Sequence, residues 1–427
     1  MTDRFKLCLG AGYPAIVVLT VVAFLSPCSR AQSFQPVSPE ELKMTVEPEV
    51  PGAPAIILFR EVDRDDNGRN SHEDHYVRIK VLTEAGRDYA NMAIEFDKSY
   101  ENVLNIHART IRTDGSIQVF DGSVFEKTIV KAKGLQYLAK TFTLPDVQVG
   151  SIIEYSYTIT LGEHYIYSSH WILNDELFTR RARFTLKPFQ AKYGKLSLRR
   201  SWQGLPPGSE AKEGPDHVFR MDVENIPGFE VEDFMPPPNE MKGRVDFIYE
   251  EQYFERDPDL YWRHVDKDWY DWLEGFVGKR KPMEEAVARI VSPNDPPELK
   301  LRKIYDRVQQ MRNTSYEIEK TAQEEKRDKE KLAQTVEDVW KRGYGNGKIL
   351  TWLYLGLIRA AGFEAYGVWV SSRSEYFFNP TTMESAKLNA NVVLVKLNGK
   401  YLYLDPGAAF TPFGCCRGLR PEHPACA

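Results

Sequence analysis

Residues 342–348 read Arg342-Gly343-Tyr344-Gly345-Asn346-Gly347-Lys348, and the apolar stretch Ile349–Ala361 follows them directly. The glycines in this loop predict a tight backbone turn, because glycine adopts conformations that other residues avoid. The stretch after the loop is apolar on nearly every helical face, and Gly362 is suited to end a helix there. A helix of this kind has no solvent-facing side, so we expect it at the centre of a domain.

The segments around this helix predict an α+β arrangement. Upstream, Thr335 and Asp338 have the spacing of a capping box, which starts a short helix. Downstream, the dipeptide Asn398-Gly399 lies between two apolar runs and is the strongest hairpin signal in the chain. The predicted strands are Ala365–Val370, Val392–Leu397 and Lys400–Leu404, and Asp405-Pro406 closes the last of them.

This order of elements resembles the transglutaminase-like superfamily, which has a papain-type α+β fold, over roughly residues 281–410. In that family the loop reads Arg-Gly-Tyr-Gly-Asp-Cys-Lys, with the nucleophilic cysteine at the N-terminus of the central helix. A histidine starts the first hairpin strand, and an aspartate at the end of the second strand orients it. The resemblance places Gly347 at the cysteine position, Asn391 at the histidine position and Asp405 at the aspartate position.

The first two of these groups are not reactive, and a shift of the hairpin register by one residue puts Ala390 at the histidine position instead. No histidine lies between His264 and His423, and no cysteine lies between Cys28 and Cys415. A thiol–imidazole couple therefore cannot be built from residues 265–414 in any register. We expect no intact catalytic triad and interpret this region as a pseudoenzyme domain.

The region before it, residues 55–235, reads as a series of short strands. Tyr76–Val81 alternates cleanly between apolar and polar residues, and Asp114-Gly115 marks a hairpin. Many short strands joined by turn residues predict an antiparallel, sandwich-like domain. The stretch Phe142–Tyr155 resembles a domain of unknown function that precedes transglutaminase-like domains in many bacterial envelope proteins. We thus expect a multidomain fold: an all-β sandwich-like domain followed by an α+β domain.

The N-terminus reads as an export signal. Arg4 and Lys6 precede the mostly apolar run Ala15–Leu25, and Ser29-Arg30-Ala31 offers small residues for cleavage after Ala31. Lipidation at Cys28 is the alternative. Beyond residue 31 no run of 18 apolar residues suggests a membrane span, so we expect an exported protein of the periplasm or cell envelope.

The chain ends in an unusual tail. Relatives of this kind continue after Phe413-Gly414 with a stretch such as Leu-Leu-Pro-Trp-Ala-Glu-Thr-Gly and a further β domain. Back-translating that stretch and dropping one base yields Cys-Cys-Arg-Gly-Leu-Arg-Pro, which is the sequence of residues 415–421. We interpret residues 415–427 as an aberrant tail from a frameshift.

The predicted organisation is a signal peptide (1–31), a linker (32–54), the β-sandwich-like domain (55–235), a linker with an aromatic helix (236–280), the transglutaminase-like domain (281–414) and this tail (415–427).

Composition narrows the possible ligands. The net charge of -5 gives no basic footprint for nucleic acid, and the body lacks cysteine for a metal site. His72-Glu73-Asp74-His75 offers metal-type ligands, but in a polar loop we expect solvated residues and predict neither a metal nor a cofactor. The spacing of Trp262, Trp269, Trp272 and Phe276 predicts an aromatic helix face that packs against a core.

The expected function follows from the empty catalytic positions. We predict a non-catalytic protein that binds a peptide or a cell-wall glycan in the transglutaminase-like cleft. The loop Ser371–Leu388 should border that cleft, with Tyr376, Phe377 and Phe378 as candidate binding residues. The alternative is a transglutaminase-like amide transferase or hydrolase that uses unrecognised chemistry. The oligomeric state stays open.

Overall fold

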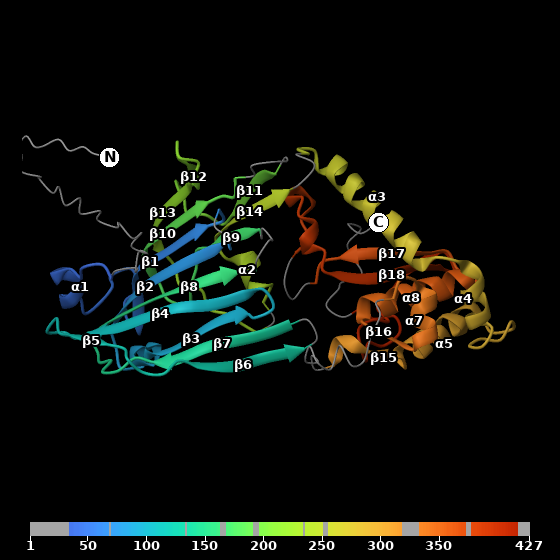
Figure 1. Cartoon of the computed structure of the whole chain (residues 1–427), viewed down its shortest axis with the longest axis horizontal. Helices are drawn as coiled ribbons and strands as arrows, with labels where there is room; N and C mark the ends of the chain where they lie inside the picture. The colour runs from blue at the N-terminus through green and yellow to red at the C-terminus, as the bar shows by residue number, and fades with distance from the viewer. Residues whose placement is uncertain are drawn as a thin grey trace, which may run out of the picture. The chain divides into compact units, whose positions relative to one another are not determined.

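The computed structural model describes residues 34–67, 70–132, 135–162, 168–190, 196–233, 235–250, 255–317, 333–372 and 377–416. The predicted signal peptide, Tyr376 and residues 417–427 of the predicted tail lie outside these ranges. Residues from Val37 onward belong to one compact unit. It consists of a β-rich part followed by a part that contains most of the helices (Figure 1).

The β-rich part is built on a large sheet of eight strands in the order β12-β13-β10-β1-β2-β8-β4-β5. In that order the strands are Lys212–Glu213, Phe219–Ile226, Thr179–Lys187, Ala55–Asp65, His72–Val81, Ile152–Leu161, Glu101–Ile111 and Ile117–Val119. Most neighbours are antiparallel, as expected, but β1 and β10 pair in parallel. The sheet is therefore mixed, because alternation of apolar residues sets which face of a strand is buried and not the direction of its partner.

Two smaller sheets cover one face of the large sheet. The first contains β3 (Asn91–Asp97), β7 (Leu135–Thr143) and β6 (Phe125–Ala132), and the second contains β11 (Ser197–Gln203), β14 (Arg244–Glu250) and β9 (Ser169–Ile172). Each has its own apolar core. Val77 and Ile79 of β2 pack with Ile94 and Phe96 of β3, while Phe184 of β10 packs with Trp171 and Phe247. The arrangement is a layered sandwich whose strands extend to Glu250, beyond the predicted boundary at 235.

Residues 37–53, part of the predicted linker, cover the opposite face of the large sheet. Ser38 and Glu41 form a capping box that starts the short helix α1 (Pro39–Lys43). Val37, Leu42, Met44, Val50 and Ala53 pack against a buried cluster that includes Ile56 and Ile152. This segment is thus an ordered cover of the sheet and does not behave as a spacer.

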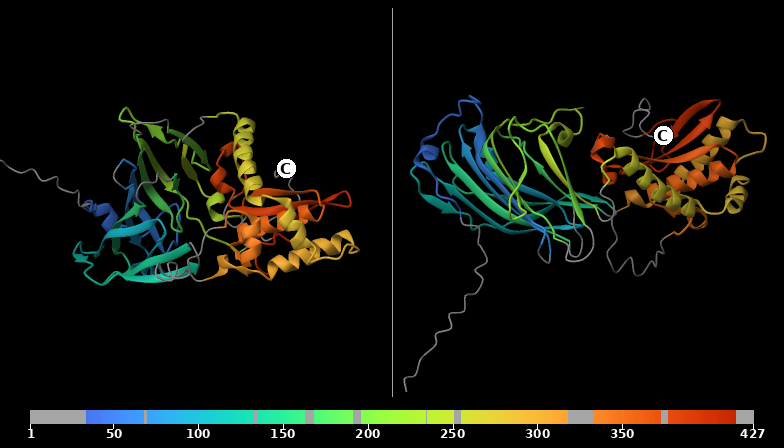
Figure 2. Two further views of the ribbon diagram at one scale, coloured as in Figure 1. Left: turned by 45° about the vertical axis from the view of Figure 1, so that its right-hand side comes forward. Right: turned by 90° about the horizontal axis from the view of Figure 1, so that it is seen from above.

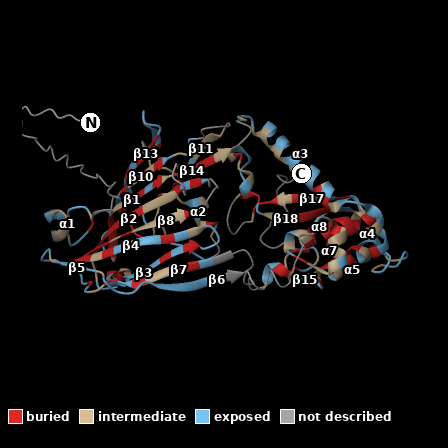
Figure 3. Ribbon diagram, viewed as in Figure 1, coloured by how far each residue is buried: buried red, intermediate tan, exposed pale blue. Residues whose placement is uncertain are grey.

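The helical part is organised around α8 (Gly347–Ala360), whose residues from Leu350 to Ile358 are all buried (Figure 3). One side of α8 faces the sheet β17-β18-β19, and α4, α5 and α7 pack around it (Figure 2). These elements are α4 (Arg280–Val287), α5 (Pro297–Gln309), α7 (Val336–Arg342), β17 (Ala365–Val370), β18 (Ala390–Leu397) and β19 (Lys400–Leu404). The prediction of a central, buried helix next to a hairpin is confirmed.

The aromatic helix is α3 (Pro258–Val277), which starts with Asp257 as its N-cap. Leu273 and Phe276 are part of the core around α8, so α3 packs with the helical part. Short elements complete the chain: α2 (Pro238–Met241), β15 (Arg312–Asn313), β16 (Tyr344–Gly345) and the 3₁₀ turns η1 (Ala85–Ala90), η2 (Thr314–Tyr316), η3 (Pro380–Thr382) and η4 (Ser385–Lys387). None of the described helices is both long and apolar enough to cross a membrane.

Candidate functional site

Gly347, Asn391 and Asp405, which the sequence resemblance placed at triad positions, lie around the N-terminus of α8. Gly347 is the first residue of α8, and Asn346 caps the helix by accepting a hydrogen bond of 2.9 Å from the Ile349 amide. Asn391 pairs with Trp369 of β17 and lies on the same face of β18 as Val393, which packs against α8. Asp405 follows β19 directly. The three residues thus lie near one another, and their proposed relation to a catalytic triad stays a prediction.

The position of Gly347 leaves no room for a side chain. A Cβ atom on Gly347 would lie 2.6 Å from the carbonyl oxygen of Gly407, a separation that real Cβ atoms essentially never show. A Cβ on Gly407 would in turn collide with the carbonyl oxygen of Gly347 and with the Thr351 hydroxyl. The backbones of these two glycines therefore touch at the start of α8.

The turn that carries Gly407 is held firmly by α5 and the segment after it. The Tyr305 hydroxyl lies 2.9 and 2.8 Å from the carbonyl oxygens of Asp405 and Thr411, and its single proton can be donated to either of them. The Gln309 amide donates to the carbonyl oxygens of residues 406 and 408, and Asn313 donates to that of Gly407 at 2.8 Å. Asp405 itself accepts a hydrogen bond of 3.2 Å from the Ala408 amide, so its carboxylate has a structural role in the turn.

Tryptophans gather beside this helix end. Trp269 of α3 stacks on Trp369 with ring centroids 5.9 Å apart and contacts Trp352 of α8 edge to face at 5.6 Å. The ammonium group of Lys348 lies 5.3 Å from the ring centroid of Trp272 and 5.7 Å from that of Trp369. Cation–π contact of this kind is favourable, although desolvation beside the rings lowers the pKa of Lys348. Trp272 is 47 % exposed, so part of this aromatic surface is open to solvent.

Three polar atoms in this cluster have no hydrogen-bond partner among the described residues. They are the indole nitrogens of Trp269 and Trp352 and the side-chain oxygen of Asn391. A buried polar group without a partner costs roughly 1–3 kcal/mol, so such groups are uncommon in folded proteins. Three of the buried polar atoms without a partner among the described residues therefore lie together beside the start of α8. We call Lys348, Trp269, Trp272, Trp352, Trp369 and Asn391 the tryptophan cluster.

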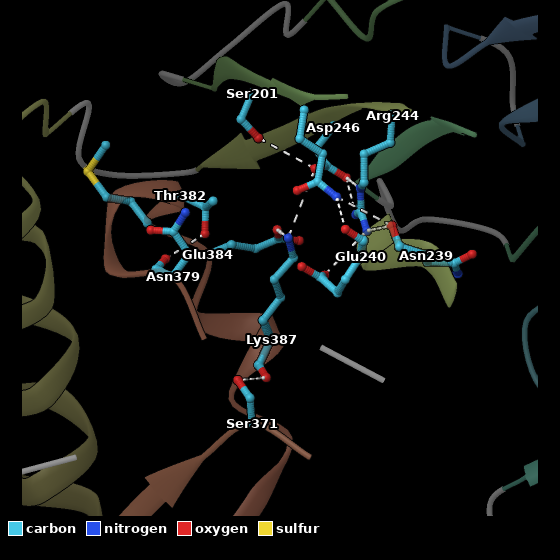
Figure 4. Close-up of polar contacts among 12 residues, drawn as sticks. Ser201, Asn239, Glu240, Arg244, Asp246, Ser371, Asn379, Thr382, Glu384 and Lys387 are labelled. Carbon is cyan, nitrogen blue, oxygen red and sulfur yellow. Dashed lines mark hydrogen bonds and ion pairs between the residues drawn. The ribbon is translucent and has the colours of Figure 1, made fainter. Parts of the chain in front are cut away.

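Two of the three aromatic residues predicted to bind a ligand, Phe377 and Phe378, lie in the described part of the loop Ser371–Leu388. Phe378 packs edge to face on Trp262 of α3, with centroids 5.1 Å apart, and Phe377 is half-buried. The second half of the loop contacts β14 and β11 through a group of charged residues (Figure 4). The role of Tyr376, Phe377 and Phe378 in binding stays a prediction.

A second enclosed polar cluster lies in the β-rich part and differs from the first because its groups are paired. The carboxylate of Glu154, with no exposed surface, accepts hydrogen bonds from Tyr76, Arg78 and Arg109 at 2.5, 2.7 and 2.5 Å. Arg78 also contacts Glu41 of α1 at 2.9 Å. Sequence alternation alone did not indicate this cluster, because the charged face of β2 is buried only by the distant segment 37–53.

Lys80 belongs to the same buried face of β2. Its ammonium group donates to the carbonyl oxygens of Leu42 and Gly150 at 2.9 and 2.6 Å, and burial lowers its pKa to about 8.

The motif His72–His75 lies at the start of β2, where Glu73 and His75 face the interior of the sandwich. This corrects the expectation of solvated residues, since His75 is 9 % exposed and stacks on Tyr157 at 4.6 Å. Burial would raise the pKa of Glu73, but a 2.7 Å hydrogen bond with His75 and the charge of Arg64 lower it to about 2. Among the described residues, no group of three or more His, Cys, Asp or Glu side chains is placed to hold a metal ion.

We compared the chain with curated proteins, with solved structures and with models of protein families. No curated protein matches the sequence. Among solved structures, a "putative protease" from Parabacteroides distasonis is similar over 82 % of this chain and 67 % of its own, with a TM-score of 0.54 and 14 % identity. At that identity the similarity concerns the fold alone.

Two further structures are much less similar. Leukotriene A4 hydrolase from Saccharomyces cerevisiae has a TM-score of 0.25 at 9 % identity, over 53 % of this chain and 36 % of its own. Aminopeptidase A from Legionella pneumophila has a TM-score of 0.24 at 8 % identity, over 46 % and 22 %. Neither value indicates a shared fold.

The family model that matches is a domain of unknown function with a solved structure, DUF3857, and residues 66–230 of this chain are a domain of that family.

Proposed function

We propose that residues 281–414 are a transglutaminase-like domain that binds a peptide or a glycan in the cell envelope without catalysing a reaction. The observation that carries this proposal is the backbone contact between Gly347 and Gly407. At the position where the family has its cysteine, this chain has neither a thiol nor the space for one. The sequence from residue 265 to residue 414 also supplies no histidine to serve as a base.

The order and placement of elements favour the family assignment. The loop 342–346 leads into a buried helix, and the hairpin β18–β19 ends at Asp405 beside the start of that helix. The Parabacteroides distasonis protein has a similar fold, and its name connects that fold with peptides. We therefore place peptides first among the ligands to test, and cell-wall glycans second.

The tryptophan cluster is the surface that we assign to binding. Trp272 and Trp369 offer flat apolar faces, Lys348 offers a positive charge, and Asn391 lies at the edge of the same sheet face. Aromatic faces with a few polar groups are typical of ligand sites, because the rings supply contact area and the polar groups fix orientation. Binding here requires no nucleophile.

The test is a binding screen of the mature protein against cell-wall peptides and glycan fragments, read by tryptophan fluorescence. A ligand of the cluster should change the emission of the wild-type protein, and Trp369→Ala should weaken its binding at least tenfold. Trp202→Ala is the matched control, because Trp202 is 63 % exposed on β11 and outside the cluster. Binding that both variants retain would refute the assignment of the site.

A separate assay tests the absence of catalysis. The protein is incubated with a glutamine-containing peptide and a primary amine, and amide exchange and hydrolysis are followed by mass spectrometry. We expect no turnover above background. Turnover that Asp405→Asn abolishes would establish the alternative, an amide transferase or hydrolase.

A further inference from the structure

The outer face of the sheet β9-β14-β11 carries charged residues that are nevertheless buried. Val245 and Phe247 of β14 point into the sandwich core, so Arg244 and Asp246 point the other way. These two residues are only 5 % and 7 % exposed. Arg244 contacts Asp246 and lies 3.6 Å from Glu240 of α2. Something other than the sandwich core must therefore cover this face.

The cover includes the segment Asn379–Lys387 of the helical part, which we call the anchor segment. Lys387 is 7 % exposed, and its ammonium group lies 3.2 Å from Glu384 and 4.0 Å from Asp246 (Figure 4). The carboxylate of Asp246 is thus shared between Arg244 of its own strand and a lysine that is distant in sequence. A buried ion pair adds little net stability, but it penalises arrangements that leave one charge unpaired.

Arg199 of β11 holds the backbone of the same segment. Its guanidinium donates to the carbonyl oxygens of Thr382 and Met383, and its other edge pairs with Glu250 at 2.9 Å. The planar, fork-shaped guanidinium can reach two adjacent carbonyl groups at once, which an ammonium group cannot do with the same geometry. Both hydrogen bonds of Arg199 to the anchor segment therefore require that its backbone keep this conformation.

The opposite side of the anchor segment contacts α3. The indole nitrogen of Trp262 donates to the carbonyl oxygen of Pro380 at 2.8 Å, and the Ser385 amide donates to the Tyr261 hydroxyl at 3.3 Å. At the neck of the loop, the Ser371 hydroxyl donates to the carbonyl oxygen of Lys387 at 2.7 Å. The segment is thus fixed between the β-rich part and the helix that carries Trp269.

We propose that the anchor segment couples the two parts of the chain into one cooperative unit, with Arg199 and Lys387 as its positioning residues. The segment joins β17 to β18, which present Trp369 and Asn391, so the β-rich part sets the position of both strand ends. This coupling is independent of whether the tryptophan cluster binds a ligand.

Hydrogen exchange of the mature protein tests the anchor. Arg199→Lys keeps a positive charge beside Glu250 but loses the fork, and Lys387→Met removes the buried ammonium group. In each variant the amides of Met383 and Lys387, which are bonded within the segment, should exchange at least tenfold faster, while those of β2 and β8 stay protected. The controls are Arg183→Lys and Lys396→Met, whose side chains form exposed ion pairs.

Calorimetry completes the test. The wild-type protein should unfold in one transition, and the double variant Arg199→Lys/Lys387→Met should unfold in two. Exchange in the segment that stays within twofold of wild type, exchange that rises equally throughout the chain, or two transitions in the wild type would each overturn the proposal. If Lys387→Met does not fold, Arg199→Lys alone decides between these outcomes.

Discussion

The network around Glu154 and the tryptophan cluster both contain buried polar groups, but these groups are hydrogen-bonded in the first and partly unpaired in the second. Each oxygen of the Glu154 carboxylate accepts at least one hydrogen bond from a charged donor. In the tryptophan cluster, two indole nitrogens and the Asn391 oxygen have no partner among the described residues. A fully satisfied network fixes structure, whereas unused hydrogen-bonding capacity is where a folded chain can still form contacts. The difference separates a structural cluster from a candidate site.

The largest effect is expected where a buried pair is broken. Arg78→Met leaves Glu154 and Glu41 without one of their charged donors and should lower the free energy of unfolding by about 3–5 kcal/mol. Urea denaturation measures this value. Arg181→Met, which removes an exposed pair with Asp222, should cost at most about 1 kcal/mol. Equal losses in the two variants would remove the contrast between buried and exposed pairs.

Acid should weaken the β-rich part through Glu73. Its pKa is about 2 in the folded state and near 4.5 when unfolded, so the unfolded state binds more protons between these values. Stability from Glu73, about 3 kcal/mol, is present above pH 4.5 and is lost as the pH falls towards 2. Glu73→Gln should reduce this loss of stability between pH 4.5 and pH 2, which thermal unfolding at a series of pH values measures. Glu213→Gln, which alters an exposed Glu–His pair, should leave the pH dependence of stability in this range unchanged.

Adding a side chain at Gly347 should destabilise the helical part. Gly347→Cys places a Cβ 2.6 Å from the Gly407 oxygen and should lower stability by about 1–3 kcal/mol, without producing amide exchange activity. Gly275→Ala on α3 is the matched control, since nothing lies within 4 Å of its Cβ position, and it should raise stability by about 0.5–1 kcal/mol. If Gly347→Cys is as stable as the wild-type protein, the backbone of the turn at Gly407 moves at little energetic cost to make room for the side chain.

The smallest effect is expected at Asn391. Asn391→Leu removes a buried oxygen that has no described partner, so the free energy of unfolding should stay the same or rise by about 1 kcal/mol. Asn313→Leu should cost more, about 1–3 kcal/mol, because Asn313 donates to Gly407 and accepts from Ser315. A large loss at Asn391 would mean that its side chain is structural, and the tryptophan cluster would then lose its main distinction from the Glu154 network.

Local signals in the sequence predicted much of the helical part. The capping box of Thr335 and Asp338 is present, and Asn398 and Gly399 both adopt positive φ angles in the hairpin turn. The apolar run after the glycine loop forms α8 within two residues of its expected bounds. These features depend on neighbours in sequence, so a single chain is sufficient to indicate them.

Contacts between distant segments were not predictable in the same way. The alternation in β2 correctly places Val77 and Ile79 inside, but it suggests that Arg78 and Lys80 face solvent. They are buried because residues 37–53 cover them, and nothing in the local sequence of β2 indicates that cover. Likewise, the lack of space for a side chain at Gly347 depends on Gly407, sixty residues away, and the local sequence around Gly347 does not indicate it.

The contact between Gly347 and Gly407 also has a consequence for how this chain can change over generations. A single codon change that introduces a cysteine at position 347 meets a backbone that Tyr305, Gln309 and Asn313 hold in place. Selection for any side chain larger than hydrogen at this position would have to move that turn first. A side chain at position 347 is therefore tolerated only after the turn at Gly407 has moved, so the order in which these two places can change is constrained.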